Sequence, residues 1–446
     1  MTQSPRPVLP ARPEPAPVQL LGWLGRFGSA AAAYGVFQAL VGVLPDDLSG
    51  VVSRYCIAAL AGIAVGSVAF LSGSLLRART TAAAAVEAAR EAPGPLPAVV
   101  EGACIGLAAE LASVEDAGRG SLTGWPHSLG EGDPPVRPTA YGTVYGLLIS
   151  LELGLPDARL KTSELVDTLW RLRLDGGGWA ARSQGAMARA EVTALVLGAL
   201  ARAGADPVRL AEEAAICETL LTQDRDPSGY DVSFVVTTVI RGLLKAAPSA
   251  AALPRLRDAL VDGAVVDPER RHLHAWGSRL TAPRGETLMP TAVHTAQAVV
   301  ALERAAKTLG EDRHTRLVRE DGIRWLLSCP TPEHTDCPDL ANRYGVVRRR
   351  NPLDPDQREQ LTVRHFAAAW LARALMSTGA REVAAEDLRE DVWQRQLAGA
   401  VGSVWAQQQD GIWRWSDGDL DRPLWMTYQG LSVLRRHALL VYRPHP

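Results

Sequence analysis

The sequence predicts an all-α fold, an (α/α)6 toroid of six helical hairpins, preceded by an N-terminal hydrophobic helical hairpin. Three observations support this prediction. From residue 98 onward, a unit of amphipathic helix, Gly-plus-aromatic loop and more apolar helix recurs. The more apolar helix of each unit is hydrophobic over much of its circumference, as a buried helix is. Two long uncharged stretches come before the first unit.

The composition bounds the class of protein. The 446 residues carry 47 Lys+Arg and 49 Asp+Glu, a net charge of −2, which argues against a nucleic-acid partner. Five cysteines, an odd number, argue against a secreted disulfide scaffold and favour a reducing compartment. Nearly all the basic residues are Arg, a bias typical of high-GC bacterial genomes.

The N-terminal part has two segments. Residues 1–19 are Pro-rich, and we expect a disordered tail there because few apolar residues are available for burial. Phe27–Leu44 and Tyr55–Leu76 are uncharged over 18 and 22 residues. About 20 apolar residues cross a bilayer as a helix. We therefore predict a membrane helical hairpin over 20–79, with membrane contact through 27–76.

Basic residues flank this hairpin on both outer sides. Arg26 precedes the first stretch, and Arg77 and Arg79 follow the second. By the positive-inside rule both ends lie in the cytoplasm, which would place the toroid beneath the cell inner membrane. The alternative is a buried helical hairpin of a soluble protein. A linker over 80–97, broken by Pro and Gly, separates this part from the toroid over 98–446.

The repeat unit combines an aromatic residue in the loop with a Thr at the start of the next helix. The loop aromatics are Trp125, Trp179, Tyr230, Trp276 and Trp413. The helix starts are marked by Thr139, Thr193, Thr237, Thr291, Thr362 and Thr427. An open solenoid would need polar capping units at both ends. The last unit is instead rich in aromatic residues, which favours a closed ring.

One loop carries a recognisable motif. Gln407-Gln408-Gln409-Asp410-Gly411-Ile412-Trp413 reads Q-x-x-x-G-x-W. This unit resembles the repeat of terpene cyclases and protein prenyltransferase β subunits, whose squalene cyclase-like members are α/α toroids. In another unit Arg173 stands at the Gln position. The resemblance implies a toroid over roughly 98–440, but several families without cyclase activity share this architecture.

The resemblance also implies a candidate catalytic residue. Class II cyclases protonate an alkene with a carboxylic acid in a D-x-D-D-T-A motif, and Glu191 falls at the position of that proton donor. Arg189 and Val192 replace the flanking carboxyl groups, and a nearby Arg makes an acid weaker. The alternative interpretation of Glu191 is a first-turn residue that the helix dipole favours.

Other residues are candidate ligand contacts. His294 lies on an expected inner helix, and Trp425 and Tyr428 begin the last one, where aromatic rings would hold an isoprenoid or other hydrophobic ligand. The alternative for all three is a place in the core. A further set resembles a carboxylate cluster for diphosphate or a divalent cation, with solvated turn residues as the alternative. This set is Asp417, Asp419 and Asp421.

The zinc site of the prenyltransferases is poorly matched. Asp336, Cys337 and His365 occur in the family order but with the wrong spacing, so we predict no metal and no cofactor. The Arg-rich insertion 329–360 would either contact anionic lipid or be a solvated loop.

Two functions remain open from the sequence. The first is a membrane-tethered toroid that binds a ligand or a partner protein, in the manner of a bacterial signalling or defence component. The alternative is an enzyme, a divergent class II terpene cyclase acting on a polyprenyl substrate with Glu191 as proton donor. Because the catalytic motifs are degenerate, the binding function is preferred.

Overall fold

The computed structural model describes residues 95–130, 136–154, 161–181, 187–223, 228–282, 287–329, 340–350, 354, 357–416 and 421–441. The chain divides into two compact units, Met1–Ala84 and Ala85–Pro446, and all described residues belong to the second. The expected Pro-rich tail and membrane hairpin lie outside the described residues. Among the described helices, none combines the length and the apolar character needed to cross a bilayer.

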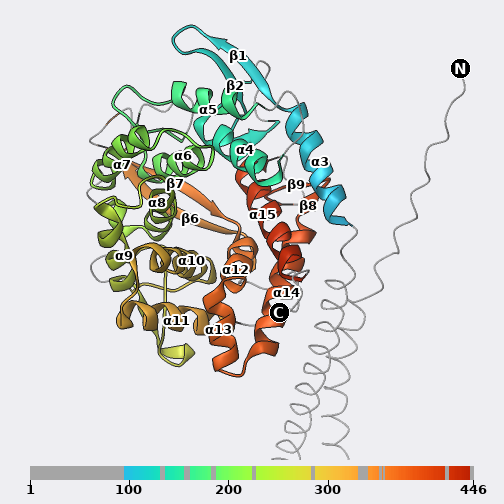
Figure 1. Cartoon of the computed structure of the whole chain (residues 1–446). Coiled ribbons are helices and arrows are strands. Elements are labelled where there is room, and N and C mark those ends of the chain that lie inside the picture. The colour runs from blue at the N-terminus through green and yellow to red at the C-terminus, as the bar shows by residue number, and fades with distance from the viewer. Residues whose placement is uncertain are drawn as a thin grey trace, which may run out of the picture. The chain divides into compact units, whose positions relative to one another are not determined.

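Six described helices, here called the inner helices, form a cycle of contacts. Each packs against the next in chain order, and the last packs against the first (Figure 1). They coincide with the apolar helices expected from the sequence. They are α4 (Ala140–Leu153), α6 (Ala190–Arg202), α8 (Ser233–Ala246), α10 (Ala292–Leu309), α12 (Ala367–Leu375) and α15 (Leu424–Val441).

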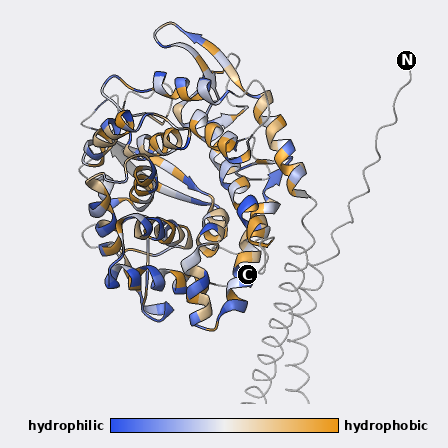
Figure 2. Ribbon diagram, in the orientation of Figure 1, coloured by the Kyte–Doolittle hydropathy of each residue, from blue (hydrophilic) through white to orange (hydrophobic). Residues whose placement is uncertain are grey.

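Amphipathic helices surround the inner ones. In Figure 2 the outer edge of α11 and α13 is mostly hydrophilic. The first of these helices begins at Pro95, inside the expected linker, because proline suits the first helical turn. The outer helices are α3 (Pro95–Ala109), α5 (Thr162–Arg171), α7 (Pro207–Leu221), α9 (Ala252–Asp262), α11 (Arg313–Leu327), α13 (Thr378–Glu386) and α14 (Glu390–Ala406).

The framework is helical, but the described residues also form small antiparallel sheets, so the all-α prediction was incomplete. The strands lie in connections between helices and pair as β1–β2, β3–β10, β4–β5, β6–β7 and β8–β9. They are β1 (Ala112–Asp116), β2 (Gly120–Gly124), β3 (Ser128–Leu129), β4 (Val265–Asp267), β5 (Leu273–Ala275), β6 (Arg343–Arg350), β7 (Arg358–His365), β8 (Gln408–Gln409), β9 (Ile412–Trp413) and β10 (Arg422–Pro423). Two short 3-10 helices are η1 (Gly229–Asp231) and η2 (Pro268–Arg270).

The first and last units of the repeat are joined directly. In the β3–β10 pair, Arg422 lies opposite Leu129 and Pro423 opposite Ser128. Arg422 Nη2 also donates to Glu110 Oε1 at 2.8 Å. These contacts between residues about 300 positions apart bring the two ends of the repeat together, as a closed ring requires.

Each loop tryptophan links an outer helix to the following inner helix. Its indole N–H donates to a carbonyl near the end of the preceding outer helix. These bonds are Trp125–Leu107 at 2.9 Å, Trp179–Leu169 at 2.6 Å, Trp276–Leu260 at 2.7 Å and Trp413–Val404 at 2.8 Å. The backbone amides of three of them donate to a Thr hydroxyl, at Trp179–Thr193, Trp276–Thr295 and Trp413–Thr427.

This geometry corrects the register assigned to the threonines. Thr139 and Thr291 are N-caps, whose hydroxyls accept backbone N–H groups at the start of α4 and α10. The residues equivalent to Thr193 and Thr427 are therefore four positions further on, which for α10 is Thr295. Thr362, expected at a helix start, lies instead in strand β7.

Candidate functional site

A cavity of about 70 Å³, here called the central cavity, lies between the inner helices. All six of them contribute to its lining, so it lies at the centre of the cycle. The lining residues are Tyr145, Leu148, Leu195, Gly198, Ala199, Arg202, Thr238, Arg241, Gly242, Lys245, Arg304, Trp370, Arg373, Tyr428 and Gln429.

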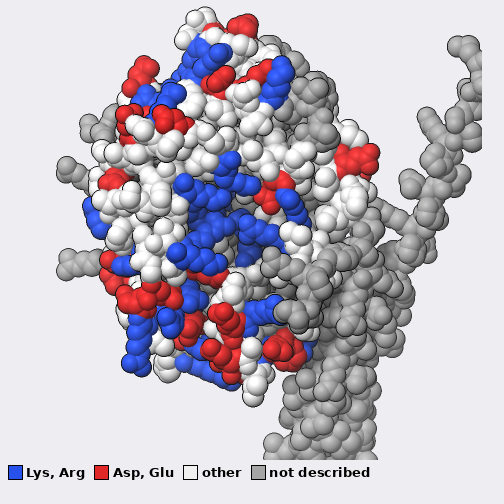
Figure 3. Space-filling model, in the orientation of Figure 1, with Lys and Arg blue, Asp and Glu red and all other residues white. Residues whose placement is uncertain are grey.

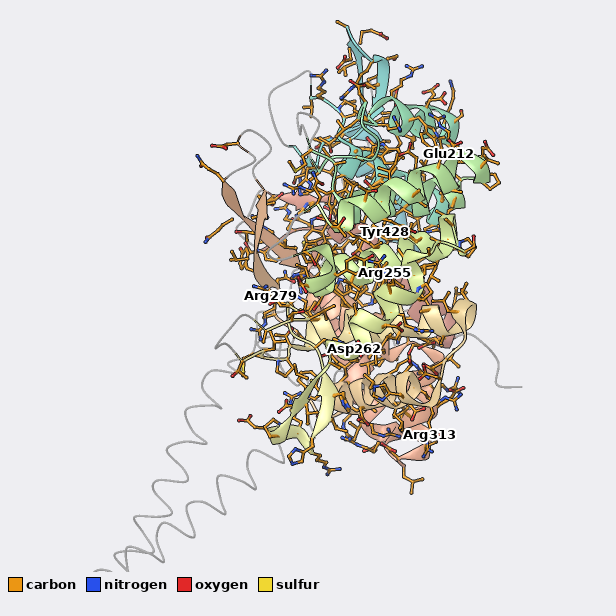
Figure 4. All side chains as sticks on the ribbon, turned by 90° about the vertical axis from the view of Figure 1, so that its left-hand side faces the viewer. Glu212, Arg255, Asp262, Arg279, Arg313 and Tyr428 are labelled. Atoms are coloured by element: carbon orange, nitrogen blue, oxygen red, sulfur yellow. The ribbon has the colours of Figure 1, made fainter. Side chains whose placement is uncertain are left out.

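The lining is strongly basic, and the cations come from corresponding positions on different helices. Arg202, Lys245 and Arg373 stand in the last turns of α6, α8 and α12. The negative end of the helix dipole favours cations there. Figure 3 shows Lys and Arg gathered in the middle of one face of the molecule. Exposed charges of the outer helices, among them Glu212 and Arg313, point away from the ring in the side view of Figure 4.

Arg241 extends from the middle of α8 into the cavity. Its Nε donates to the Thr237 carbonyl at 3.0 Å, and its Nη2 lies 3.0 Å from Thr238 Oγ1. Both acceptors are neutral. Burial, and then the charge of Arg373, lower the pKa of the Arg241 guanidinium to about 10. The group stays cationic at neutral pH without a carboxylate partner among the described residues.

Arg373 is the most deeply buried cation of the cavity, with 5% of its surface exposed. Its Nε has no hydrogen-bond partner in the described structure. Its Cζ lies 4.7 Å from the centroid of the Trp370 ring. Burial, followed by repulsion from Arg436, lowers its pKa to about 9. A buried cation with an unused donor is costly unless an anion completes its environment.

Arg304 and Arg436 add further positive charge. Burial, then Arg241 and Arg436, lower the pKa of Arg304 to about 10. Neither side chain forms an ion pair with a described residue. Arg202 differs, because its Nη2 pairs with Glu152 Oε2 at 3.0 Å. Among the described residues, Arg202 is therefore the one cation lining the cavity that is held in an ion pair.

A second hollow of about 280 Å³ shares Arg304 and Arg373 with the central cavity. Glu303 lies on the wall of this hollow and places a negative charge near Arg304 and Arg373. Glu303 Oε1 already accepts from Lys307 Nζ at 3.4 Å and from the Thr378 amide at 3.2 Å. Apolar side chains of α10 and α15, with Met376 at the C-cap of α12, complete this second hollow, here called the outer hollow.

Tyrosines form the aromatic side of the cavity. Tyr428, expected from the sequence to contact a ligand, lines it together with Tyr145, and their ring centroids are 5.7 Å apart. Tyr141 continues the row, 5.1 Å from Tyr145. Trp425 does not line the cavity: it is 6% exposed and packs against Trp415, with ring centroids 6.2 Å apart. Trp425 is therefore a core residue.

Glu191 lies in the first turn of α6 and is half-buried. Its charge contributes to raising the pKa values of Tyr141 and Cys217, behind the larger effect of burial. Arg189, at the N-cap of the same helix, is 8% exposed. Glu191 is not among the residues that line the central cavity. Among the described residues, no three His, Cys, Asp or Glu side chains converge to hold a metal ion.

His294 is brought together with His365. His294 Nδ1 lies 2.8 Å from Thr291 Oγ1, and the two imidazole centroids are 4.9 Å apart. Burial lowers both pKa values, that of His365 to about 4. Gln297 Nε2 lies 3.5 Å from His365 Nδ1. This neutral pair packs where the β6–β7 hairpin meets α10. The two other residues considered for zinc, Asp336 and Cys337, lie outside the described residues.

The carboxylate loop is only partly described. Asp417 and Asp419 lie outside the described residues. Asp421 forms an ion pair with Arg364. The Arg364 guanidinium carbon is 5.0 Å from the Trp415 ring centroid. Asp421 therefore helps to hold the β6–β7 hairpin against the last unit.

The basic cluster was missed in the sequence analysis, although a signal was present. Basic residues close the apolar helices α6, α8, α10 and α12 in turn, at Arg202, Lys245, Lys307 and Arg373. A single basic residue in the last turn of a helix is common, because it can donate hydrogen bonds to the last carbonyl groups. Only their repetition on helices of one ring indicates a shared basic site.

Comparisons with known proteins give little further information. No family model matches the sequence, and the search of curated proteins also gives no match. Neither comparison therefore supports membership of the terpene cyclase family. Among solved structures, the chain is similar to a glycoside hydrolase family 76 mannosidase from Bacteroides thetaiotaomicron. The identity is 9%, the TM-score is 0.46, and the match covers 78% of this chain and 100% of the other.

Proposed function

We propose that the chain is an (α/α)6-toroid binding protein whose central cavity holds a phosphate-class anion. The observation that carries the proposal is that Arg241, Arg304 and Arg373 line one cavity without a carboxylate partner among the described residues. Buried charges are normally paired. Guanidinium groups bind phosphate through paired N–H donors, and phenol hydroxyls supply further donors.

The size of the cavity favours a small anionic group. About 70 Å³ accommodates on the order of five water molecules, which is room for a phosphate or diphosphate. Pockets for drug-sized molecules measure roughly 300–1,000 Å³. A ligand larger than the anionic group itself would extend beyond the central cavity, either into the outer hollow that shares Arg304 and Arg373 or past the exposed Lys245.

The cyclase alternative receives less support. A carbocation would be repelled by the guanidinium groups that line the cavity, and like charges repel strongly away from bulk water. Glu191 does not line this cavity, and Arg189 stands at the N-cap of the same helix. The anion-binding proposal requires no proton donor.

The cellular setting remains a prediction from the sequence. The two uncharged stretches within 27–76 would anchor the chain in the cell inner membrane, with the toroid in the cytoplasm. In this arrangement the protein would report the presence of an anionic ligand to a membrane-associated partner. A hydrophobic or isoprenoid ligand is compatible only if its anionic end enters the cavity.

Calorimetric titration of the full-length chain in non-ionic detergent with inorganic diphosphate tests the proposal. We expect saturable binding that Arg373→Met weakens at least tenfold, because a charge-assisted hydrogen bond contributes about 1.5–3 kcal/mol. Arg313→Met removes an exposed charge from α11 and is the matched control, with unchanged affinity expected. Equal binding by the wild type and Arg373→Met, or no binding by the wild type, would overturn the proposal.

A further inference from the structure

Lys245 occupies a distinctive position in the basic cluster. It stands in the last turn of α8 and lines the central cavity together with Arg202 and Arg304. Its side chain is exposed to solvent, so the amine is accessible at the cavity. No ion pair joins Lys245 to a described residue. Its nearest acidic neighbour in electrostatic terms, Glu152, already pairs with Arg202 at 3.0 Å.

The other two lysines of the chain have different surroundings. Lys161 Nζ lies 2.9 Å from Glu164 Oε1, and Lys307 Nζ lies 3.4 Å from Glu303 Oε1. In both cases a carboxylate engages the amine. Three lysines in one chain therefore provide an internal comparison: two face carboxylates, and Lys245 faces arginines.

The arginines promote the neutral amine of Lys245. Partial burial lowers its pKa, and Arg202, Arg304 and Arg436 lower it further, to about 8. A substantial fraction of the side chain is thus unprotonated at mildly alkaline pH. Lysines beside other cations or in desolvated pockets are the ones that attack carbonyl groups.

We infer that Lys245 is a nucleophilic amine that captures an anionic carbonyl compound, a phosphorylated aldehyde or a 2-oxo acid, as a Schiff base at the cavity. The inference rests on the proposed anion site. The guanidinium groups of Arg304 and Arg373 would hold the phosphate or carboxylate, because Arg binds such groups through a planar fork of donors. Lys245 would then meet the carbonyl carbon of the same molecule.

The reaction balances without a further reagent. The Lys245 nitrogen lone pair forms a C–N bond with the carbonyl carbon, and one amine proton passes to the carbonyl oxygen to give a carbinolamine. The hydroxyl group then leaves as water with the second amine proton, which gives a neutral imine. A proton from solvent converts this imine to an iminium ion, whose positive charge the bound anion offsets. No atom is oxidised or reduced, and water reverses the step.

Pyridoxal 5′-phosphate, which carries both an aldehyde and a phosphate, is a direct probe. The full-length chain is incubated with it at pH 8, reduced with sodium borohydride and analysed by peptide mass spectrometry. We expect the label on Lys245 at least tenfold above Lys161 and Lys307. Pyridoxal, which lacks the phosphate, should label Lys245 at least tenfold less. Equal labelling of the three lysines, or equal labelling by the two aldehydes, would overturn the inference.

Two measurements on the wild-type chain separate this inference from the proposed function, and Lys245→Arg checks the labelling. This variant keeps the positive charge and removes the amine, so total pyridoxal 5′-phosphate incorporation should fall to the level of Lys161 and Lys307. If diphosphate binds the wild type but pyridoxal 5′-phosphate leaves Lys245 unlabelled, the Schiff-base inference fails and the anion site stands. If diphosphate does not bind, the proposed function itself fails.

Discussion

Arg241 and Arg373 share one aromatic ring. Their guanidinium carbons lie 4.5 Å and 4.7 Å from the centroid of Trp370. Arg241 comes from α8 and Arg373 from α12, with α10 between them in the cycle of inner helices. The ring stabilises each cation by about 0.5–2 kcal/mol, yet the two charges repel each other. An anion bound near the two guanidinium groups would therefore offset the repulsion between them.

Removal of one of these cations should stabilise the ligand-free protein. Arg373→Met deletes a buried charge with an unused donor while keeping most of the apolar side chain. We expect the free energy of unfolding without ligand to rise by about 1–3 kcal/mol, the scale of an unsatisfied buried polar group. Chemical denaturation in phosphate-free buffer measures it. A clear loss of stability would show that the charge is satisfied within the protein.

Diphosphate should stabilise the wild-type chain by mass action. At a ligand concentration of 100 times the dissociation constant, the gain is about 2.7 kcal/mol. Denaturation with and without diphosphate, at constant ionic strength set with chloride, measures this gain. Arg373→Met should lose most of it, whereas Arg313→Met should keep it. An equal gain from chloride alone would indicate general screening.

Acid should destabilise the ring through His365. Burial holds its folded-state pKa at about 4, below the usual 6.5, so the unfolded chain takes up the proton first as the pH falls. Stability present above pH 6.5 is therefore lost between pH 6.5 and 4, by up to about 3 kcal/mol for this group. His294 contributes in the same direction.

His365→Asn should flatten this pH dependence, because it removes the titrating group and keeps a polar atom near Gln297. His314, exposed on α11, provides the matched control, and His314→Asn should leave the profile unchanged. Denaturation midpoints measured from pH 7.5 to 5 test the expectation. Parallel profiles for the wild type and His365→Asn would contradict it.

Gly430 makes room for the loop tryptophan of the last unit. A Cβ atom there would lie 2.2 Å from Trp413 Cε2, whereas one at Gly402 of α14 would meet nothing within 4 Å. Gly430→Ala should destabilise the fold by about 1–3 kcal/mol through overpacking. Gly402→Ala should stabilise it by about 0.5–1 kcal/mol through helix propensity. Chemical denaturation measures both effects. Equal changes in the free energy of unfolding for the two variants would contradict the tight packing of Trp413 against Gly430.

The helical repeat was predictable because its signals are local. A tryptophan that bonds both an outer-helix carbonyl and an inner-helix hydroxyl requires fixed residue types at short spacing, as at Trp179 and Thr193. The β6–β7 hairpin was missed because the Arg-rich stretch 329–360 resembles a solvated loop and because Thr362 was expected to begin a helix. Tyr344 and Val346 in β6, and Leu361 and Val363 in β7, carry the period-two signal of strands.

The site was less predictable because its residues are distant in sequence and ordinary one at a time. Arg241 and Arg373 are separated by 132 positions, and each fits its own helix without a functional role. They form one basic site only because the cycle of inner helices brings α8 and α12 to the same cavity. Aromatic residues near a helix start suggest a cavity wall. Tyr428 does line the central cavity, and its contact with a ligand stays a prediction, whereas Trp425 packs in the core.

The position of a bound anion tests the central claim most directly. Crystals of the wild-type chain equilibrated with tungstate, a phosphate analogue, near its solution dissociation constant would show the site through anomalous scattering. The account predicts a peak in the central cavity within hydrogen-bonding distance of the Arg241, Arg304 and Arg373 guanidinium groups. Peaks only on the outer surface, with the cavity holding water alone, would contradict it.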